Sequence, residues 1–313
     1  YQDDKFETEN YSVFVNLDYA LTDRLNAVVG LRYTDEEKTY DFAHPPFLVV
    51  PDPVVSAFDR VDYRIALTYA INDAMTVYGS VATGFRSGGF NPRPFNASQL
   101  TSFGPEELTA YELGLKSEFW DRRVRLNVAA FYSDYQDRIV TEQKIDAQGL
   151  PYEAPMNIGT ADIDGFEAEF TILPISGLTI SGAVGYANFT SPDLNGKNQT
   201  AVPDWTANLG IDYRFELGNW GSVTPRIDWT YQSEVFYQAD NDPIARTPGR
   251  TLANAAIVWK PQAEDWSVTF AVTNLTDKEY MVQQFSYLPL GYGLLNGQPG
   301  RPREWALSIK KEF

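Results

Sequence analysis

RPREWALSIKKEF, the sequence of residues 301–313 at the end of the chain, has the pattern of a β-strand with one apolar face. Its apolar residues recur at a period of two, and successive side chains of a strand point to opposite faces. These apolar positions are Trp305, Leu307, Ile309 and Phe313. Apart from Ala306, the opposite face is polar or charged, with Glu304, Ser308, Lys310 and Glu312. A transmembrane β-barrel needs such a final strand, because it must pair with the first strand and present apolar side chains to lipid.

The same period-two pattern, interrupted by turns, precedes this strand along most of the chain. Residues 11–19 and 25–33 form the first predicted pair of strands, joined by the turn LTDR at residues 21–24. The later pairs are 61–69 with 75–83, 111–119 with 124–134, 166–172 with 178–188, 205–215 with 223–231, and 253–259 with 266–272. Longer connections separate the pairs, among them 34–60, 85–107, 135–157 and 274–300. Strands at this spacing predict an all-β sandwich or barrel, and the alternation of short turns with long connections favours the outer-membrane barrel.

The number of predicted strands bears on how much of a barrel the chain contains. Counting gives about thirteen strands, whereas bacterial single-chain barrels have even numbers. We therefore expect the C-terminal part of a larger, antiparallel transmembrane β-barrel, with residues 1–313 forming one sheet without a separate domain boundary. The start of the sequence, YQDDKFETEN, is polar and acidic and has no signal peptide, so we expect a processed or partial chain.

Composition narrows the class of protein further. Aromatic residues make up 14% of the chain, which suits two girdles of rings at the membrane interfaces. No apolar run approaches the roughly 18 residues that a membrane helix needs, so a helical span is excluded. The formal net charge of −17 argues against nucleic acid as a partner, because phosphate binding requires a basic surface. The absence of cysteine excludes disulfides and thiolate sites.

The face opposite the apolar positions carries charges of both signs on neighbouring strands. We predict cross-strand ion pairs there and a polar interior, as in a wide water-filled or plugged barrel. The solvent face of an ordinary soluble sheet is the alternative interpretation of the same pattern. The residues are Arg32, Arg64, Glu112, Lys116, Glu118, Arg125, Asn127, Glu167, Glu169, Asp212, Arg214, Arg226 and Asp228.

No motif predicts an enzyme, a cofactor site or a metal site. His44 is the one histidine; it precedes two prolines in a predicted connection, and no GxSxG elbow accompanies it. The glycine-rich stretch at residues 79–89 lacks the GK[ST] ending of a phosphate loop. We expect Gly79 and Gly84 to relieve crowding in a strand or to mark a bulge. DIDG at residues 162–165 is similar to the start of a calcium loop but lacks the EF-hand spacing.

Two predicted connections carry candidate ligand-binding residues. Arg86, Phe90 and Arg93 lie in one of them, where basic and aromatic residues interleave within an acidic chain. Tyr287 and Tyr292 lie in the last connection. Exposed arginines and aromatic residues are typical binding anchors, and connections on a rigid scaffold commonly carry function. The alternative is that these rings belong to the outer interfacial girdle.

Several longer segments resemble the C-terminal barrel of TonB-dependent outer-membrane receptors. They are ENYSVFVNLDYALTDRLNAVVGLRYTDEEK (9–38), VYGSVATGFRSGGFNP (77–92), ELTAYELGLKSEFWDRRVRLNVAAFYSDYQD (107–137), NIGTADIDGFEAEF (157–170) and NLTDKEY (274–280). The final WALSIKKEF is also similar, although Lys311 stands where an aromatic residue often lies in that family.

The resemblance implies a 22-stranded barrel with a plugged lumen, whose N-terminal plug and TonB-contacting segment we expect outside this sequence. It also implies a multi-pass protein of the Gram-negative outer membrane, with outer-membrane lipid and the TonB complex as partners. The implied function is energised import of a scarce nutrient, most often a ferric siderophore. On this hypothesis Arg86 and Arg93 attract an anionic chelate, while Phe90, Tyr287 and Tyr292 pack on its aromatic or apolar parts.

Other functions are compatible with the same sequence. A receptor of this kind for cobalamin, haem or a carbohydrate would share the wall, and so would a non-energised outer-membrane pore. A soluble β-rich domain that binds carbohydrate or acts as an enzyme is the third possibility. An upstream sequence without a plug would favour the pore, and recovery without detergent would favour the soluble domain.

Overall fold

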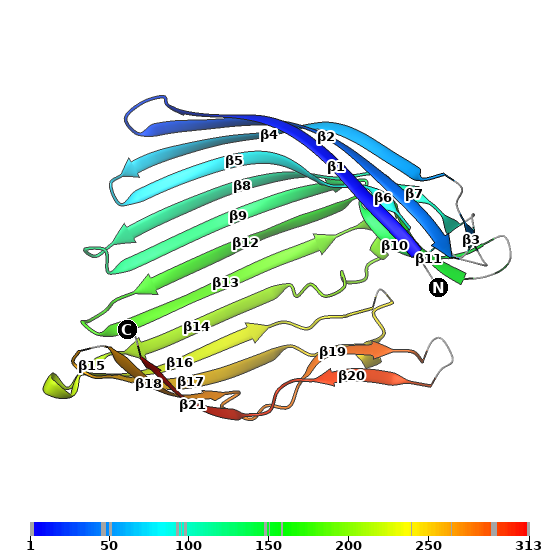
Figure 1. Cartoon of the computed structure of the whole chain (residues 1–313). Helices are drawn as coiled ribbons and strands as arrows, with labels where there is room; N and C mark the ends of the chain where they lie inside the picture. Colours follow the sequence, from blue (N-terminus) through cyan, green and yellow to red (C-terminus); the bar gives the residue numbers. More distant parts are fainter. Residues whose placement is uncertain are drawn as a thin grey trace.

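The computed structural model of the chain describes residues 3–44, 48–49, 52–91, 94, 96, 99–146, 149, 151–157, 159–238, 240–263, 265–288 and 293–311. These residues form a curved antiparallel sheet whose strands follow one another in chain order (Figure 1). Within the described part, its path runs through thirteen strands, and β3 (Leu48–Val49) and β15 (Phe215–Glu216) add short pairings to β2 and β16. The strands of the path are β1 (Asp3–Ala20), β2 (Leu25–His44), β4 (Val54–Asn72), β5 (Met75–Arg86), β8 (Glu106–Phe119), β9 (Val124–Gln136), β12 (Ala161–Ile172), β13 (Leu178–Thr190), β14 (Trp205–Tyr213), β16 (Ser222–Gln232), β17 (Arg250–Lys260), β18 (Trp266–Thr273) and β21 (Glu304–Lys311).

Short turns and long connections lie at opposite ends of the sheet, as the sequence predicts (Figure 1). We call these the short-turn end and the long-connection end. At the long-connection end the chain forms three hairpins: β6 (Gly89–Phe90) with β7 (Ser102–Phe103), β10 (Ile139–Ile145) with β11 (Pro151–Asn157), and β19 (Met281–Ser286) with β20 (Leu295–Pro299). The described connections also contain the 3-10 helices η2 (Pro192–Leu194), η3 (Gly218–Trp220) and η4 (Pro243–Ala245). In the described part of the chain, no helix is both long enough and apolar enough to cross a membrane.

The apolar stripe of each strand lies on an exposed face of the sheet. Val13 and Leu17 of β1 are 67% and 62% exposed, and Leu113 of β8, in the middle of the wall, is 62% exposed. In a soluble sandwich these stripes would pack against a second sheet about 10 Å away. Exposed rows of Val, Leu and Ile are instead what a barrel wall presents to hydrocarbon. The structure therefore confirms the antiparallel barrel wall predicted from the sequence, present here as an open section, and excludes the two stacked sheets of a sandwich.

Aromatic rings border the apolar stripe at both of its ends. Tyr11 and Tyr111 lie toward the long-connection end and are 68% and 48% exposed. Tyr19 and Trp220 lie at the short-turn end and are 68% and 77% exposed. Rings with a polar atom suit the boundary between hydrocarbon and water, so these positions fit the two predicted girdles.

The strands of the first part of the sheet extend much further than the sequence predicts. Residues 34–60 were expected to form a polar connection, but β2 continues to His44 and β4 begins at Val54. The two strands stay in register along this extension, from Tyr33 opposite Val61 to Tyr40 opposite Val54. The prediction was wrong because the buried positions of the extension mix polar and aromatic residues, namely Thr34, Glu36, Tyr40 and Phe42, so the apolar alternation that marks the membrane-spanning part is lost.

The face opposite the apolar stripe, called the polar face below, carries the predicted ion pairs only in part. Arg125 of β9 lies opposite Glu118 of β8 and its Nη2 is 2.8 Å from Glu118 Oε1, which confirms a cross-strand pair. Arg226 instead pairs along its own strand, with Asp228 at 2.7 Å. All these groups are partly exposed, so each pair contributes little to stability, about 0–1 kcal/mol.

Crowding is not the reason for Gly79 and Gly84, the two glycines of β5. A Cβ on Gly84 would meet no atom within 4 Å, and one on Gly79 would lie 3.8 Å from its nearest neighbour. The crowded position is Gly114 of β8, where a Cβ would lie 2.4 Å from the ring of Tyr78 on β5. The ring crosses the glycine and its hydroxyl donates to Glu112 at 2.6 Å. Glycine at 114 thus lets an aromatic side chain lie flat on the polar face.

Candidate functional site

The long-connection end carries an ordered rim, which consists of the hairpins β6–β7, β10–β11 and β19–β20 and the strand ends that hold them (Figure 1). The described residues of the rim include Arg86, Phe90 and Tyr287, which the sequence predicts to bind a ligand. Ring stacking, ion pairs and hydrogen bonds of side chains fix each hairpin to the wall or to a neighbouring connection.

Phe90 anchors β6 against the polar face of β2. Its ring is 6% exposed and stacks on Tyr40, with centroids 5.7 Å apart. Phe6 of β1 meets Phe90 edge-on at 6.4 Å, and Phe42 lies 5.7 Å from Tyr40. Each such ring pair stabilises by about 0.5–1.5 kcal/mol beyond the area buried. Burial raises the pKa of Tyr40 to about 12, because a buried tyrosinate would lose its hydration.

A buried carboxylate fixes the start of the same connection. Glu36 is 7% exposed, accepts a hydrogen bond from Asn10 Nδ2 at 2.9 Å and lies 3.2 Å from Lys38 Nζ. Lys38 Nζ also donates to the backbone oxygen of Gly88 at 2.6 Å. Burial alone would raise the pKa of Glu36, but hydrogen bonds from Asn10, Ser87 and Lys38 bring that pKa below its ordinary value. The carboxylate is therefore charged at neutral pH and holds β1, β2 and the segment after β5 together.

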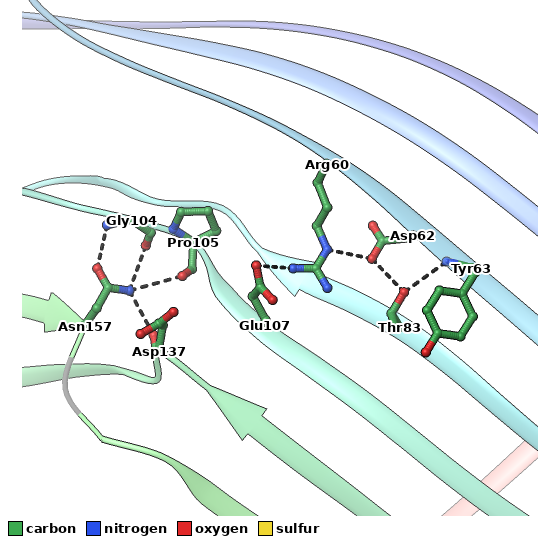
Figure 2. A network of polar contacts seen from close by, with 9 residues as sticks. All are labelled: Arg60, Asp62, Tyr63, Thr83, Gly104, Pro105, Glu107, Asp137 and Asn157. Atoms are coloured by element: carbon green, nitrogen blue, oxygen red, sulfur yellow. Dashed lines mark hydrogen bonds and ion pairs between the residues drawn. The ribbon is translucent and has the colours of Figure 1, made fainter.

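Arg60 joins three strands, β4, β5 and β8, at the base of the rim (Figure 2). Its Nε donates to Asp62 at 2.8 Å and its Nη1 pairs with Glu107. Asp62 also accepts a hydrogen bond from the Thr83 hydroxyl at 3.0 Å, and the guanidinium lies 6.0 Å from the centre of the Phe85 ring. Burial alone would lower the pKa of Arg60, but Asp62 and Glu107 raise it above its ordinary value. The guanidinium therefore stays charged and stiffens the wall beneath β6–β7.

Asn157 connects the chain before β8 to the chain after β9 (Figure 2). Its Oδ1 accepts from the backbone N–H of Gly104 at 2.5 Å. Its Nδ2 lies within hydrogen-bond distance of three backbone oxygens, those of Gly104 at 3.0 Å, Pro105 at 3.2 Å and Asp137 at 2.9 Å. One amide side chain thus satisfies backbone groups on two separate connections, which otherwise would need water.

Asp146 fixes the other side of the β6–β7 connection. Its carboxylate accepts from Asn96 Nδ2 at 2.6 Å and from Gln99 Nε2 at 2.8 Å. Asn91 Nδ2 in turn donates to the backbone oxygen of Gln99 at 2.8 Å. The connection between β5 and β8 is therefore held by β1 and β2 on one side and by the β10–β11 hairpin on the other.

The β19–β20 hairpin has its own contacts with the preceding connection. Gln238 Nε2 donates to the backbone oxygen of Ser286 at 3.0 Å, and the Ser286 N–H donates back to Gln238 Oε1. Gln284 Nε2 donates to the backbone oxygen of Arg246 at 3.1 Å. These bonds join segments that are far apart in sequence, so the last third of the rim is ordered as well.

Asn274, the first residue of the segment NLTDKEY, closes the base of that hairpin. The residue has a left-handed backbone, with φ 48°, and is 5% exposed. Its Nδ2 donates to the backbone oxygens of Lys278 at 2.9 Å and Arg301 at 3.1 Å. Asp277 then accepts from the Arg303 N–H at 3.0 Å. The entry into β21 is thus fixed to the exit from β18.

The predicted ligand-binding residues occupy different environments on the rim. Arg86 ends β5, is exposed and lies opposite Glu106 in the register of β5 and β8. Phe90 is buried, so its ring fixes β6 and leaves little surface for a ligand. Tyr287 follows β19 and is half-buried, with its N–H donating to Leu294 at 2.9 Å. Arg93 and Tyr292 lie outside the described residues, and among the described ones no contact joins Tyr287 to Arg86.

The sequence did not single out Arg60, Asn157 or Asp146, which hold the rim. Arg60 lies in the segment expected to be a connection, and Asn157 and Asp146 are polar residues among many in another one. Apart from Asp62, which lies two residues from Arg60, their partners include Glu107, Gly104 and Gln99, which are 47 to 53 residues away, so no local spacing identifies the three residues. Within the described residues, no group of three His, Cys, Asp or Glu side chains is arranged to hold a metal ion. Of the predicted ligand-binding residues that the structure describes, Arg86 is exposed and Tyr287 is half-buried, so these two side chains remain accessible at the rim.

Comparison with known proteins agrees with this arrangement. Residues 1–275 match the family described as TonB dependent receptor-like, beta-barrel. The pesticin receptor of Yersinia pestis is 25% identical over 295 residues, which is 92% of this chain and 41% of that protein. The ferric-pyoverdine 358 receptor of Pseudomonas putida is 23% identical over 317 residues, which is 96% of this chain and 35% of that protein.

Solved structures share the fold at lower sequence identity. The ferric yersiniabactin uptake receptor FyuA from Yersinia pestis superposes with a TM-score of 0.83 at 20% identity, covering 100% of this chain and 47% of that one. The siderophore receptor PiuA from Acinetobacter baumannii superposes with a TM-score of 0.78 at 20% identity, covering 98% of this chain and 43% of that one. This chain thus spans less than half the length of the relatives that it matches.

Proposed function

Because the chain belongs to the TonB-dependent receptors, a family of outer-membrane β-barrel receptors, we propose that it forms part of the wall of an importer for a ferric siderophore. The observation that carries the proposal is the combination of an apolar stripe facing outward, a charged opposite face and an ordered rim at one end only. A rigid rim at the mouth of a barrel is where such a protein binds its ligand. The relatives are named as receptors for pesticin, ferric pyoverdine and ferric yersiniabactin, which favours a ferric siderophore over cobalamin, haem or a carbohydrate.

The proposal includes the partners that such an importer needs. Residues 1–313 act as one unit of the wall in contact with outer-membrane lipid, and an N-terminal plug fills the lumen. The TonB complex acts through that plug and uses the proton-motive force to release the ligand inward. An uncoupler that abolishes uptake, while binding to the cell surface continues, distinguishes this energised importer from a passive pore.

Arg86 is the described residue best suited to attract the chelate. It is exposed at the end of β5, and none of the described residues forms an ion pair with it. Arg93 follows a few positions later in the connection, and Tyr287 and Tyr292 would supply rings from the β19–β20 hairpin. Phe90 serves the site indirectly in this proposal, because its buried ring fixes the segment that follows Arg86.

The test uses the full-length receptor in a strain that lacks its own copy. Replacing both arginines, Arg86→Gln with Arg93→Gln, should weaken binding of radioactive iron carried by the bacterium's siderophores about tenfold or more. The reason is that each hydrogen bond to a charged group contributes about 1.5–3 kcal/mol. Arg122→Gln is the matched control, because Arg122 is 87% exposed on a turn at the short-turn end. Unchanged binding in the double variant, with normal amounts of receptor in the membrane, would reject the assignment of these residues, and absence of energised uptake by the wild type would reject the function.

A further inference from the structure

Arg250 begins β17 on the polar face of the wall, below the β19–β20 hairpin. Its side chain is half-buried, and its guanidinium lies 5.1 Å from the centre of the Tyr280 ring. Nη1 donates to the backbone oxygen of Met281 at 3.2 Å, and Nη2 donates to Gln232 Oε1 at 3.2 Å. These three contacts fix the plane and the position of the guanidinium. A guanidinium has five N–H groups, so donors remain for a further acceptor.

No carboxylate among the described residues forms an ion pair with Arg250, although the chain has 42 acidic residues. Other arginines nearby are paired: Arg246 Nη1 lies 3.2 Å from Glu234, and Arg226 lies 2.7 Å from Asp228. The partners of Arg250 are an amide, a carbonyl and a ring, which are all neutral. None of the described acidic residues therefore compensates its positive charge.

The guanidinium lines a hollow of about 330 Å³ in the polar face of β13, β14, β16 and β17. The register sets Gly185 opposite Thr206, Asn208 opposite Thr230, and Gln232 opposite Arg250. Gly185 and Ala183 have little or no side chain, which leaves the space open. Thr206, Asn208, Thr230 and Gln232 add hydroxyl and amide groups to the lining. No acidic residue is part of the lining, although Glu167 and Glu169 of β12 lie next to it, opposite Gly185 and Ala183. A fixed cation beside neutral hydrogen-bonding groups is suited to a carboxylate, which accepts two parallel bonds from an arginine.

We propose that this hollow binds a carboxylate of the imported chelate, with Arg250 as its anchor and Gln232 as the residue that positions Arg250. The inference rests on the proposed function and narrows the substrate to ferric chelates that carry a carboxylate. The hollow lies on the wall and Arg86 is not part of its lining, so the hollow acts on a different part of the ligand or at a later step of its entry.

Ferric citrate, a polycarboxylate chelate, is the probe for the test, and its binding to purified full-length receptor is measured by calorimetry. Arg250→Gln should weaken binding about tenfold or more, because a hydrogen bond between two charged groups is lost. Arg250→Lys should recover only part of the affinity, since lysine keeps the charge but not the planar pair of donors. Arg246→Gln is the matched control and should change affinity less than about twofold, because that arginine is already paired with Glu234.

Gln232→Glu provides a second test. The glutamate keeps an oxygen that can accept the hydrogen bond from Arg250 Nη2, so the local fold should be unchanged. It adds a carboxylate beside the guanidinium, so it should weaken ferric citrate binding as much as Arg250→Gln does. A neutral ferric trihydroxamate is the comparison probe, and neither variant should lower its binding. If the wild type binds no ferric citrate, or if both variants bind it unchanged, the inference is wrong. Siderophore uptake by the wild type then still decides the proposed function separately.

Discussion

A single amide side chain, that of Asn157, holds two connections of the rim at once. It satisfies the backbone N–H of Gly104 and lies beside backbone oxygens on both sides (Figure 2). Removing it would leave these groups to water or unpaired, at about 1–3 kcal/mol for a buried group. The hydrogen bonds of Asn157 therefore help to keep the chain around Gly104 and the chain around Asp137 in fixed positions.

Asn157→Ala should loosen the rim while leaving the wall intact. We expect faster amide hydrogen exchange in residues 99–105 and 137–146, with unchanged exchange in β12 and β13. Asn188→Ala is the control, because its amide bonds only to side chains of Asp164 and Thr190 on the wall. Equal exchange at the rim in the Asn157→Ala variant and the wild type would show that other contacts suffice.

Because Tyr40 is buried in the rim, we expect the stability of the rim to fall at alkaline pH. Its folded-state pKa of about 12 is above the ordinary value of 10.0, because the ring is buried against Phe90. The neutral form therefore stabilises the rim fully below pH 10, and this contribution is lost as the pH rises through 12. Tyr40→Phe should remove that loss without removing the ring stack. The measurement is hydrogen exchange or protease sensitivity of residues 87–91 at pH 9 and pH 11, and an equal change in both proteins would contradict the assignment.

At the scale of a strand, the exposed stripe should tolerate apolar side chains only. Leu113 of β8 is 62% exposed and has neighbouring strands on both sides, so it faces hydrocarbon near the middle of the stripe. Leu113→Lys should lower the free energy of unfolding in lipid vesicles by about 2–4 kcal/mol. Asn127→Lys on the polar face of β9 is the control and should have an effect below about 1 kcal/mol. Similar losses for both variants would mean that the stripe does not face lipid.

The strands were predictable where one face meets lipid and the other meets water. Residues 11–19 and 61–69 alternate apart from Phe14 and Ala66, and they lie within β1 and β4. The alternation ends at Tyr33 in β2, because beyond that residue neither face meets hydrocarbon. Backbone pairing continues there with polar and aromatic residues mixed on the buried face, so apolar alternation in the sequence could not predict it.

The residues of the rim were harder to predict than the strands. Arg86 and Tyr287 were found by residue type and by their place in connections, and their roles stay predictions. Phe90 was expected to contact a ligand, yet its burial depends on Tyr40 and Phe6, which are more than 45 residues away. Arg250 was not found at all, since its significance lies in the absence of an acidic partner among the described residues.

At the scale of the whole molecule, the sheet is the scaffold, and the connections carry the candidate ligand-binding residues. Every strand of the path pairs with its neighbour in chain order, and segments that are not neighbours in this order come together at the rim. The connection between β5 and β8 is the clearest case, because it contacts β1, β2 and the β10–β11 hairpin. A ligand at Arg86 would therefore act on a segment that is already fixed on both sides.

The length of β2 has a consequence for how a solute arrives. From Tyr33 the strand continues to His44, and eleven residues at about 3.3 Å each give roughly 35 Å of protein along the strand. This extension of β2 therefore continues the sheet beyond the apolar stripe, and Glu36, Lys38 and Tyr40 lie on its polar face. A solute that approached from the long-connection end would meet this part of the sheet before it met the apolar stripe.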